Sequence, residues 1–194
     1  MTILSQNKTM ECKKWTPLRP FFAKKRNTMT NKTRFLAHGA LLAALYTALT
    51  YFQNFLIPNS ATWAIQFRAS EALCVLALFT PAAIPGLSIG CLLFNLSFSG
   101  ALPLDPVMGT AATVLATTAM YLTRRITVKG YPLLAMLMPA LCNAVLVGWE
   151  LDIYIGGGFW LNALYVAIGE LAVLLTLGTA LFYTIRNRNL TRFF

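Results

Sequence analysis

Acidic residues and histidine are scarce in this sequence. It holds six Asp and Glu and one His among 194 residues, and charged residues of both signs make up only 11%. A soluble domain carries about 25% charged residues, so this composition argues against a soluble protein. A metal-dependent enzyme needs clustered His and carboxylate ligands, which one histidine cannot supply. We therefore expect no metal and no cofactor.

Closely spaced cysteines are also missing. Cys12, Cys74, Cys91 and Cys142 show no C-x-x-C spacing, and three of the four lie in apolar stretches. This pattern supports neither a metal centre nor a disulfide framework. We interpret these cysteines as small buried hydrophobic residues.

Apolar residues, in contrast, are abundant: they make up 57% of the chain. Six apolar segments follow Thr33, at 34–57, 62–79, 84–98, 106–123, 131–152 and 159–185, each ended by proline, glycine or arginine. A spanning helix needs about 20 residues, which the first, fifth and sixth segments meet, whereas the third is short. The sequence predicts an all-α integral membrane protein, a bundle of about six transmembrane helices.

The net charge of +10 could indicate a nucleic-acid-binding protein, but the basic residues are in the wrong places for one. Nine of the sixteen Lys and Arg lie in residues 1–34, three lie at 124–129 and three at 186–192, and only Arg68 stands elsewhere. Such clusters at the ends of apolar segments follow the positive-inside rule. We therefore expect both termini in the cytoplasm and no nucleic-acid partner.

The chain divides into one membrane domain and two short tails. Residues 1–31 are polar and basic without helical periodicity, so we expect a disordered tail, with 1–28 a possible extension upstream of a second start at Met29. The apolar run that follows is too long for a secretory signal. Residues 32–188 form the expected membrane domain, and 189–194 a short cytoplasmic tail.

A charge pair, Arg68 and Glu71, interrupts the second apolar segment. Charged groups inside a membrane are costly, at about 2.5–3.5 kcal/mol each, and usually face a protein interior or a water-filled cavity. One interpretation is an exposed helix-surface pair at i, i+3. The other is that both residues line a cavity open to the outside, with Arg68 orienting Glu71.

Other polar residues share the expected outer level of the bundle. Asn143 and Glu150 lie seven apart on the fifth segment and share a face, as do Asn162 and Glu170, eight apart, on the sixth. The asparagines could instead link helices by hydrogen bonds, and the tryptophans could form an interfacial belt. The candidate binding residues are Arg68, Glu71, Asn95, Asn143, Glu150, Trp160, Asn162 and Glu170. Carboxylates, amides and an indole face suit a small planar heterocycle with several N–H donors.

The first apolar segment carries small residues at a spacing of four. Ala40, Ala44 and Ala48 repeat in this way, flanked by Gly39, Ala43 and Thr47. Small-xxx-small spacing allows another helix to approach closely. The approaching helix could belong to a partner or to the same chain.

Four motifs resemble one known family. QFRASEAL at 66–73, TPAAIPGLSIGCLLFNL at 80–96, PALCNAVLVGWEL at 139–151 and FWLNALYVAIGEL at 159–171 resemble the QueT family of queuosine-precursor transporters, over roughly residues 32–185. These are substrate-binding S-components of energy-coupling-factor (ECF) transporters.

The resemblance implies a six-helix subunit, without its own ATPase, in the plasma membrane of a bacterium. Its ligand would be a 7-deazaguanine base or queuine captured from outside. Its partners would be a transmembrane T-component, docking on Ala40, Ala44 and Ala48, and two cytoplasmic ATPase subunits. The alternative is a self-sufficient small secondary transporter of another planar nutrient, although no inverted repeat is evident. An intramembrane enzyme is disfavoured, because the acids at 105 and 152 lie at segment ends.

Overall fold

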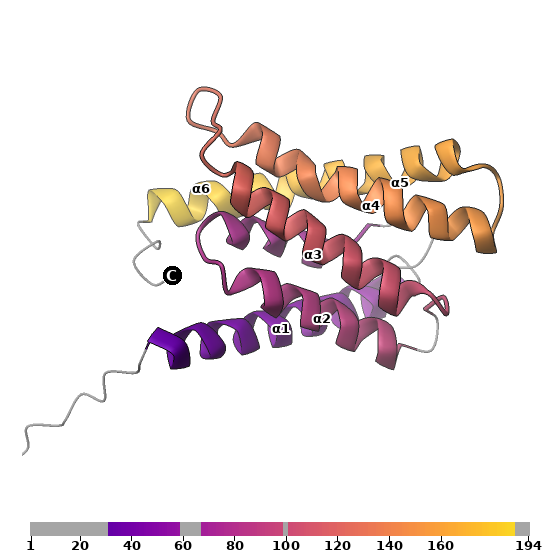
Figure 1. The fold of residues 1–194 in the computed structure, drawn as a ribbon, viewed down its shortest axis with the longest axis horizontal. Coiled ribbons are helices and arrows are strands. Elements are labelled where there is room, and N and C mark those ends of the chain that lie inside the picture. Colours follow the sequence, from indigo (N-terminus) through magenta and orange to yellow (C-terminus); the bar gives the residue numbers. More distant parts are fainter. Residues whose placement is uncertain (1–30, 59–66, 99–100, 189–194) are drawn as a thin grey trace, which may run out of the picture.

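The computed structural model describes residues 31–58, 67–98 and 101–188 (Figure 1). The described part is helical and, apart from one bridge between Val128 and Tyr131, contains no β-structure. The elements are α1 (Asn31–Leu56), the 3₁₀ helix η1 (Ala69–Leu78), α2 (Ala83–Ser97), α3 (Asp105–Thr123), α4 (Leu133–Tyr154), α5 (Phe159–Val173), the π-helical turn η2 (Leu174–Gly178) and α6 (Thr179–Asn187). Of the expected tails at 1–31 and 189–194, residues 1–30 and 189–194 lie outside the described residues, and Asn31 is the first residue of α1.

Among the described residues, three helices have the length and composition to cross a membrane. They are Asn31–Leu56, Leu133–Tyr154 and Phe159–Asn187, the last being α5, η2 and α6 in one continuous helix. These three correspond to the first, fifth and sixth predicted segments. The helical, membrane character of the prediction therefore agrees with the structure. The third and fourth predicted segments also correspond to single helices, α2 and α3.

The second predicted segment differs from a spanning helix. Within 62–79 the described residues form the ten-residue η1. A 3₁₀ helix rises about 2.0 Å per residue, so η1 is about 20 Å long and shorter than the roughly 30 Å hydrocarbon core. All its residues from Ser70 to Ala77 are buried. Because a lipid-facing helix and a protein-enclosed helix are equally apolar, composition alone could not separate them.

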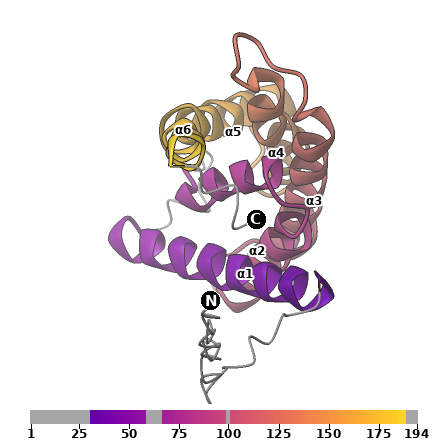
Figure 2. The ribbon, with the colours of Figure 1, turned by 90° about the vertical axis from the view of Figure 1, so that its left-hand side faces the viewer.

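The helices surround η1 (Figure 2). Consecutive helices α1, α2, α3, α4 and α5 pack side by side, and η1 contacts every one of them as well as η2 and α6. Viewed along the bundle, η1 lies inside the curved wall that these helices form (Figure 2). The main core cluster combines η1 residues such as Val75 with Tyr46, Leu87, Met136 and Phe182.

Glycines bring α2 against α1 at backbone contact distance. A Cβ on Gly86 would lie 2.6 Å from the carbonyl oxygen of Gly39, and a Cβ on Gly90 would lie 2.7 Å from that of Ala43. Such approach requires small residues on both helices. The internal contact therefore uses the stripe that contains Gly39 and Ala43, whereas Ala40, Ala44 and Ala48 are exposed.

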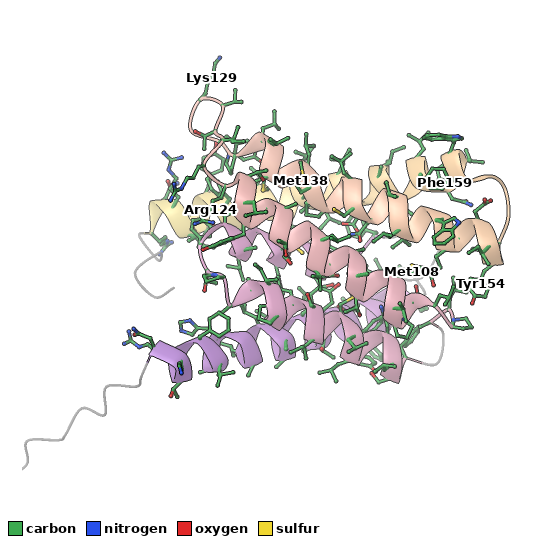
Figure 3. The ribbon with its side chains drawn as sticks, viewed as in Figure 1. Met108, Arg124, Lys129, Met138, Tyr154 and Phe159 are labelled. Carbon is green, nitrogen blue, oxygen red and sulfur yellow. The ribbon has the colours of Figure 1, made fainter. Side chains whose placement is uncertain are left out.

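Basic residues gather at one end of the bundle. Arg124 and Lys129 lie at the end where α1 begins and α6 finishes, whereas Met108, Tyr154 and Phe159 lie at the opposite end (Figures 1 and 3). The start of α1 and the end of α6 thus share one end with the loop between α3 and α4. The positive-inside rule predicts this arrangement for a chain whose two termini lie on the same side of a membrane.

Candidate functional site

A cluster of buried polar side chains occupies the interior of the bundle. Each member is at most 5% exposed although it comes from an apolar segment or its edge. We call these residues the polar cluster: Arg68, Glu71, Asn95, Asp105, Asn143, Glu150 and Glu170. Together they place one guanidinium among four carboxyl groups. Unpaired buried charge is strongly unfavourable, so such a concentration of acids points to function rather than to stability.

Glu71 is held by two neighbouring side chains. The Tyr46 hydroxyl donates to its Oε1 at 2.5 Å, and the Cys74 thiol donates to its Oε2 at 3.1 Å. Arg68 and Glu71 are 4% and 1% exposed, so an exposed helix-surface pair does not describe them. Tyr46 on α1 therefore fixes the orientation of a carboxylate on η1.

Hydrogen bonds from a polar face of α1 hold the start of η1 in place. The Gln53 amide donates to the carbonyl of Phe67 and accepts from the backbone N–H of Ala69 at 2.5 Å. Thr50 donates to the Ser70 hydroxyl at 2.8 Å. The two bonds of Gln53 satisfy backbone groups at the point where an extended segment becomes a helix. They also fix the position from which Arg68 projects.

Arg68 reaches across the interior to α2 and α3. Its Nη1 atom lies 3.7 Å from the position that a Cβ on Gly109 would take, and Asn95 Nδ2 lies 2.8 Å from the same point. Any side chain at 109 would therefore displace Asn95, which makes this glycine part of the site. Arg68 interacts electrostatically with Glu71 and Asp105.

Asn95 and Asp105 join α2 to α3. Asn95 Nδ2 donates to the backbone carbonyl of Asp105 at 2.9 Å, and Asp105 Oδ2 accepts from the N–H of Leu102 at 2.7 Å. Asn95 Oδ1 is buried and accepts no hydrogen bond from the described residues. Asn95 therefore keeps one acceptor available in the interior.

The carboxyl groups of α4 and α5 have the fewest partners. Asn143 Nδ2 donates to Glu170 Oε1 at 3.0 Å. Glu170 Oε2 and both carboxyl oxygens of Glu150 are buried and, within the described residues, have no hydrogen-bond partner. Asp105 and Arg68 act electrostatically on Glu150, so these groups are close neighbours. The polar cluster is therefore rich in acceptors and poor in donors.

This composition defines what the cluster can bind. Carboxylates accept hydrogen bonds and donate none, so the missing partners are N–H or O–H donors or a cation. The described residues contain no group of three or more His, Cys, Asp or Glu that could hold a metal ion. A small ligand with several N–H donors fits the available acceptors best.

Several predicted site residues lie away from this interior. Trp160 is 84% exposed, so its ring does not face the buried acids. Asn162 is buried, but its Nδ2 donates to the carbonyl of Gly156 at 2.9 Å and so supports the loop between α4 and α5. Of the other tryptophans considered for an interfacial belt, Trp149 is 51% exposed, and Trp63 lies outside the described residues.

Two residues that the sequence analysis did not select, Tyr46 and Asp105, belong with the site. Tyr46 is fully buried against Glu71, and Asp105 is 1% exposed beside Asn95 and Arg68. A signal for Tyr46 was available, because Tyr46, Thr50 and Gln53 follow helical spacing on one face. Asp105 precedes Pro106 and therefore resembled an ordinary helix start.

Ionisable groups buried inside an all-helical membrane protein are typical, as a class, of proteins with a substrate or ion pathway. The family model described as "QueT transporter" matches residues 36–187, which is most of the chain. The chain therefore belongs to the QueT transporter family, and the predicted family is confirmed. The family is one of transporters, in agreement with the prediction of a membrane transport protein rather than an enzyme. No curated protein and no solved structure matches the chain significantly.

Proposed function

We propose that this protein is the substrate-binding S-component of an ECF-type importer and that it takes up a queuosine precursor, a 7-deazaguanine base or queuine. Family membership carries the proposal. The polar cluster supplies a site for it, since buried acids within a membrane normally mark a ligand pathway.

The edge of a guanine-like base complements an acceptor-rich site. Its N1–H and exocyclic amino group are adjacent donors that one carboxylate can accept side by side. Both oxygens of Glu150 and Oε2 of Glu170 are available for such bonds within the described residues. The amide of Asn95 offers an acceptor and its own N–H donors to the remaining polar atoms of the base.

The excess of acid over base further favours a ligand that carries a positive charge. Four carboxyl groups face one guanidinium in the polar cluster. A precursor whose 7-position bears an amine would place a cation among these carboxyl groups, whereas a precursor with a nitrile at the same position would not. Within the proposed function, we therefore favour an amine-bearing 7-deazaguanine whose ammonium group lies among these acids while Glu150 accepts the base edge.

An exposed face of α1 supports the proposed partners. Ala40, Ala44 and Ala48 are exposed, so the bundle does not use this small stripe for its own packing. We propose that a transmembrane T-component docks there and that two cytoplasmic ATPase subunits drive the transport step. In this arrangement both termini lie in the cytoplasm of a bacterium, and residues 32–188 form one membrane domain of six segments in the plasma membrane.

The test is a binding series on purified protein. Aminomethyl-7-deazaguanine, the corresponding nitrile, guanine, riboflavin, thiamin and biotin are titrated against the wild type and Glu150→Gln while thermal unfolding is followed. We expect the amine to bind most tightly. Glu150→Gln should cost about 1.5–3 kcal/mol, or roughly tenfold to over a hundredfold in Kd, because a charge-assisted bond is lost.

Two outcomes contradict the proposal at different levels. Equal binding of amine and nitrile would remove the charge argument and leave the substrate class intact. Binding of a vitamin in place of every 7-deazaguanine would remove the substrate class. Copurification tests the partners separately, since a self-sufficient secondary transporter would purify without ATPase subunits and still take up its substrate.

A further inference from the structure

A second polar site lies at the basic end of the bundle, the end that carries Arg124 and Lys129 (Figure 3). It shares no residue with the polar cluster. A cavity of about 310 Å³ that is open to the surface lies there between the end of η1, the loop between α3 and α4, and α6. The residues that line it are Leu78, Phe79, Arg124, Thr127, Gly130, Pro132, Phe182 and Arg186. Two arginines and no acid are among them.

The two arginines are held in place by backbone carbonyls. Arg186 Nη1 donates to the carbonyl of Gly130 at 2.6 Å. Arg124 Nη1 donates to the carbonyl of Tyr121 at 2.5 Å, and its guanidinium lies 3.5 Å from the centroid of the Tyr121 ring. A guanidinium has five N–H groups, so each arginine keeps donors for a further acceptor. Both side chains are thus fixed before any anion arrives.

The remaining wall of the cavity is apolar and aromatic. Phe182 stacks on Phe79 with ring centroids 5.9 Å apart and meets Tyr131 edge to face at 5.7 Å. The ligand that this cavity suits therefore combines an anionic group with apolar parts. Its volume lies at the lower end of ligand sites, about 300–1,000 Å³, which suits a headgroup rather than a whole lipid.

The cavity also lies at the level where a lipid headgroup would lie. Arg124, labelled in Figure 3, follows the last residue of α3, and Arg186 belongs to the last turn of α6. Basic pockets between membrane helices at this level, on the side that the positive-inside rule makes cytoplasmic, bind the phosphates of anionic lipids. An arginine can donate two parallel hydrogen bonds to a phosphate. It therefore suits a phosphate better than a lysine, which acts as a point charge.

We infer that this cavity binds the phosphodiester headgroup of an anionic phospholipid between Arg124 and Arg186. The inference needs only a membrane-embedded chain and does not depend on the transported substrate. A soluble phosphate shares the same chemistry, so the experiment must separate it from a lipid.

The experiment follows thermal unfolding of the full chain in detergent. Phosphatidylglycerol, phosphatidylcholine, sn-glycerol 3-phosphate and inorganic phosphate are each titrated. Both lipids carry a phosphodiester, but the choline of phosphatidylcholine adds a cation that the two arginines repel, so we expect the wild type to bind phosphatidylglycerol about tenfold or more tightly. The soluble phosphates should leave the unfolding temperature unchanged.

A matched pair of double variants separates a site from general attraction. Arg124→Gln with Arg186→Gln removes the two lining charges, and Arg125→Gln with Arg188→Gln removes two neighbouring charges outside the cavity. The first should abolish the preference for phosphatidylglycerol and the second should keep it. If the first double variant does not fold, Arg186→Gln is compared with Arg188→Gln. The inference is overturned if both double variants lose the preference for phosphatidylglycerol equally or if neither loses it. It is also overturned if a soluble phosphate raises the unfolding temperature.

Discussion

Two adjacent alanines on α1, Ala43 and Ala44, face opposite surroundings and allow a sharp test. Ala43 is buried against α2, and Ala44 is exposed. Replacing each in turn by leucine adds the same atoms one residue apart on the same helix. We expect Ala43→Leu to damage the fold, and Ala44→Leu to leave the fold and ligand binding intact while abolishing uptake.

The magnitudes follow from the contact between α1 and α2. A Cβ on Gly90 would lie 2.7 Å from the Ala43 carbonyl oxygen and 3.1 Å from its Cα, so no space exists there for three further carbons. Overpacking of this kind costs about 1–3 kcal/mol. For a chain of this size that cost lowers the unfolding temperature by roughly 2–12 °C. An exposed substitution usually stays within about 0.5 kcal/mol.

The assay combines three measurements on each variant. Thermal unfolding reports the fold, ligand titration reports the polar cluster, and cellular uptake with copurification of the ATPase subunits reports coupling. A branched side chain at Ala44 would hold a docking helix away and remove its close contacts, so uptake and copurification should fall together.

The result that refutes this reasoning is equally specific. If Ala44→Leu lowers the unfolding temperature as far as Ala43→Leu, the exposed stripe serves the internal packing of the chain. If Ala44→Leu transports normally, the stripe is no docking surface and the assignment of the T-component to α1 is wrong.

Three further changes test the packing around the polar cluster. Tyr46→Phe removes the hydrogen bond to Glu71 without changing shape, and we expect a loss of about 1.5–3 kcal/mol in unfolding free energy or ligand affinity; unchanged values for both would contradict it. Gln53→Leu leaves two backbone groups at the start of η1 unpaired and should lower stability by about 1–3 kcal/mol in thermal unfolding. Gly148→Ala places a Cβ 2.8 Å from the Cα of Ala163 and should separate α4 from α5, with a loss of about 1–3 kcal/mol; a normal unfolding temperature would show that the helices adjust freely.

The sequence predicted the helical segments well because their ends carry strong signals. Proline or glycine follows the first, second, third and fifth segments, and two arginines follow the fourth. The sequence could not predict that η1 is a short 3₁₀ helix buried inside the bundle. The stretch ASEALCVLAL is equally compatible with lipid and with a protein interior, and only the surrounding helices decide which it meets.

Candidate site residues could be predicted where a charged side chain stands in an otherwise apolar segment. Arg68, Glu71 and Glu150 stand out because charges in apolar segments are costly, and the structure buries all three. Tyr46 escaped selection because tyrosine is common both in cores and at membrane interfaces. Trp160 was selected for its flat ring, but the sequence does not say which way a residue in the first turn of a helix faces, and here the side chain is exposed.

The polar cluster and the close packing of the helices have a common physical explanation. Four oxygen atoms of the cluster, on Asn95, Glu150 and Glu170, are buried without a hydrogen-bond partner in the described residues, and each such group costs about 1–3 kcal/mol. Glycine-mediated contacts between α1 and α2 and between α4 and α5 supply compensating dispersion energy. Because the cluster draws on η1, α2, α3, α4 and α5, a ligand that satisfies it would join most of the bundle at once. Ligand binding and the stability of the whole bundle are therefore linked, by about 2.7 kcal/mol at a ligand concentration one hundred times Kd.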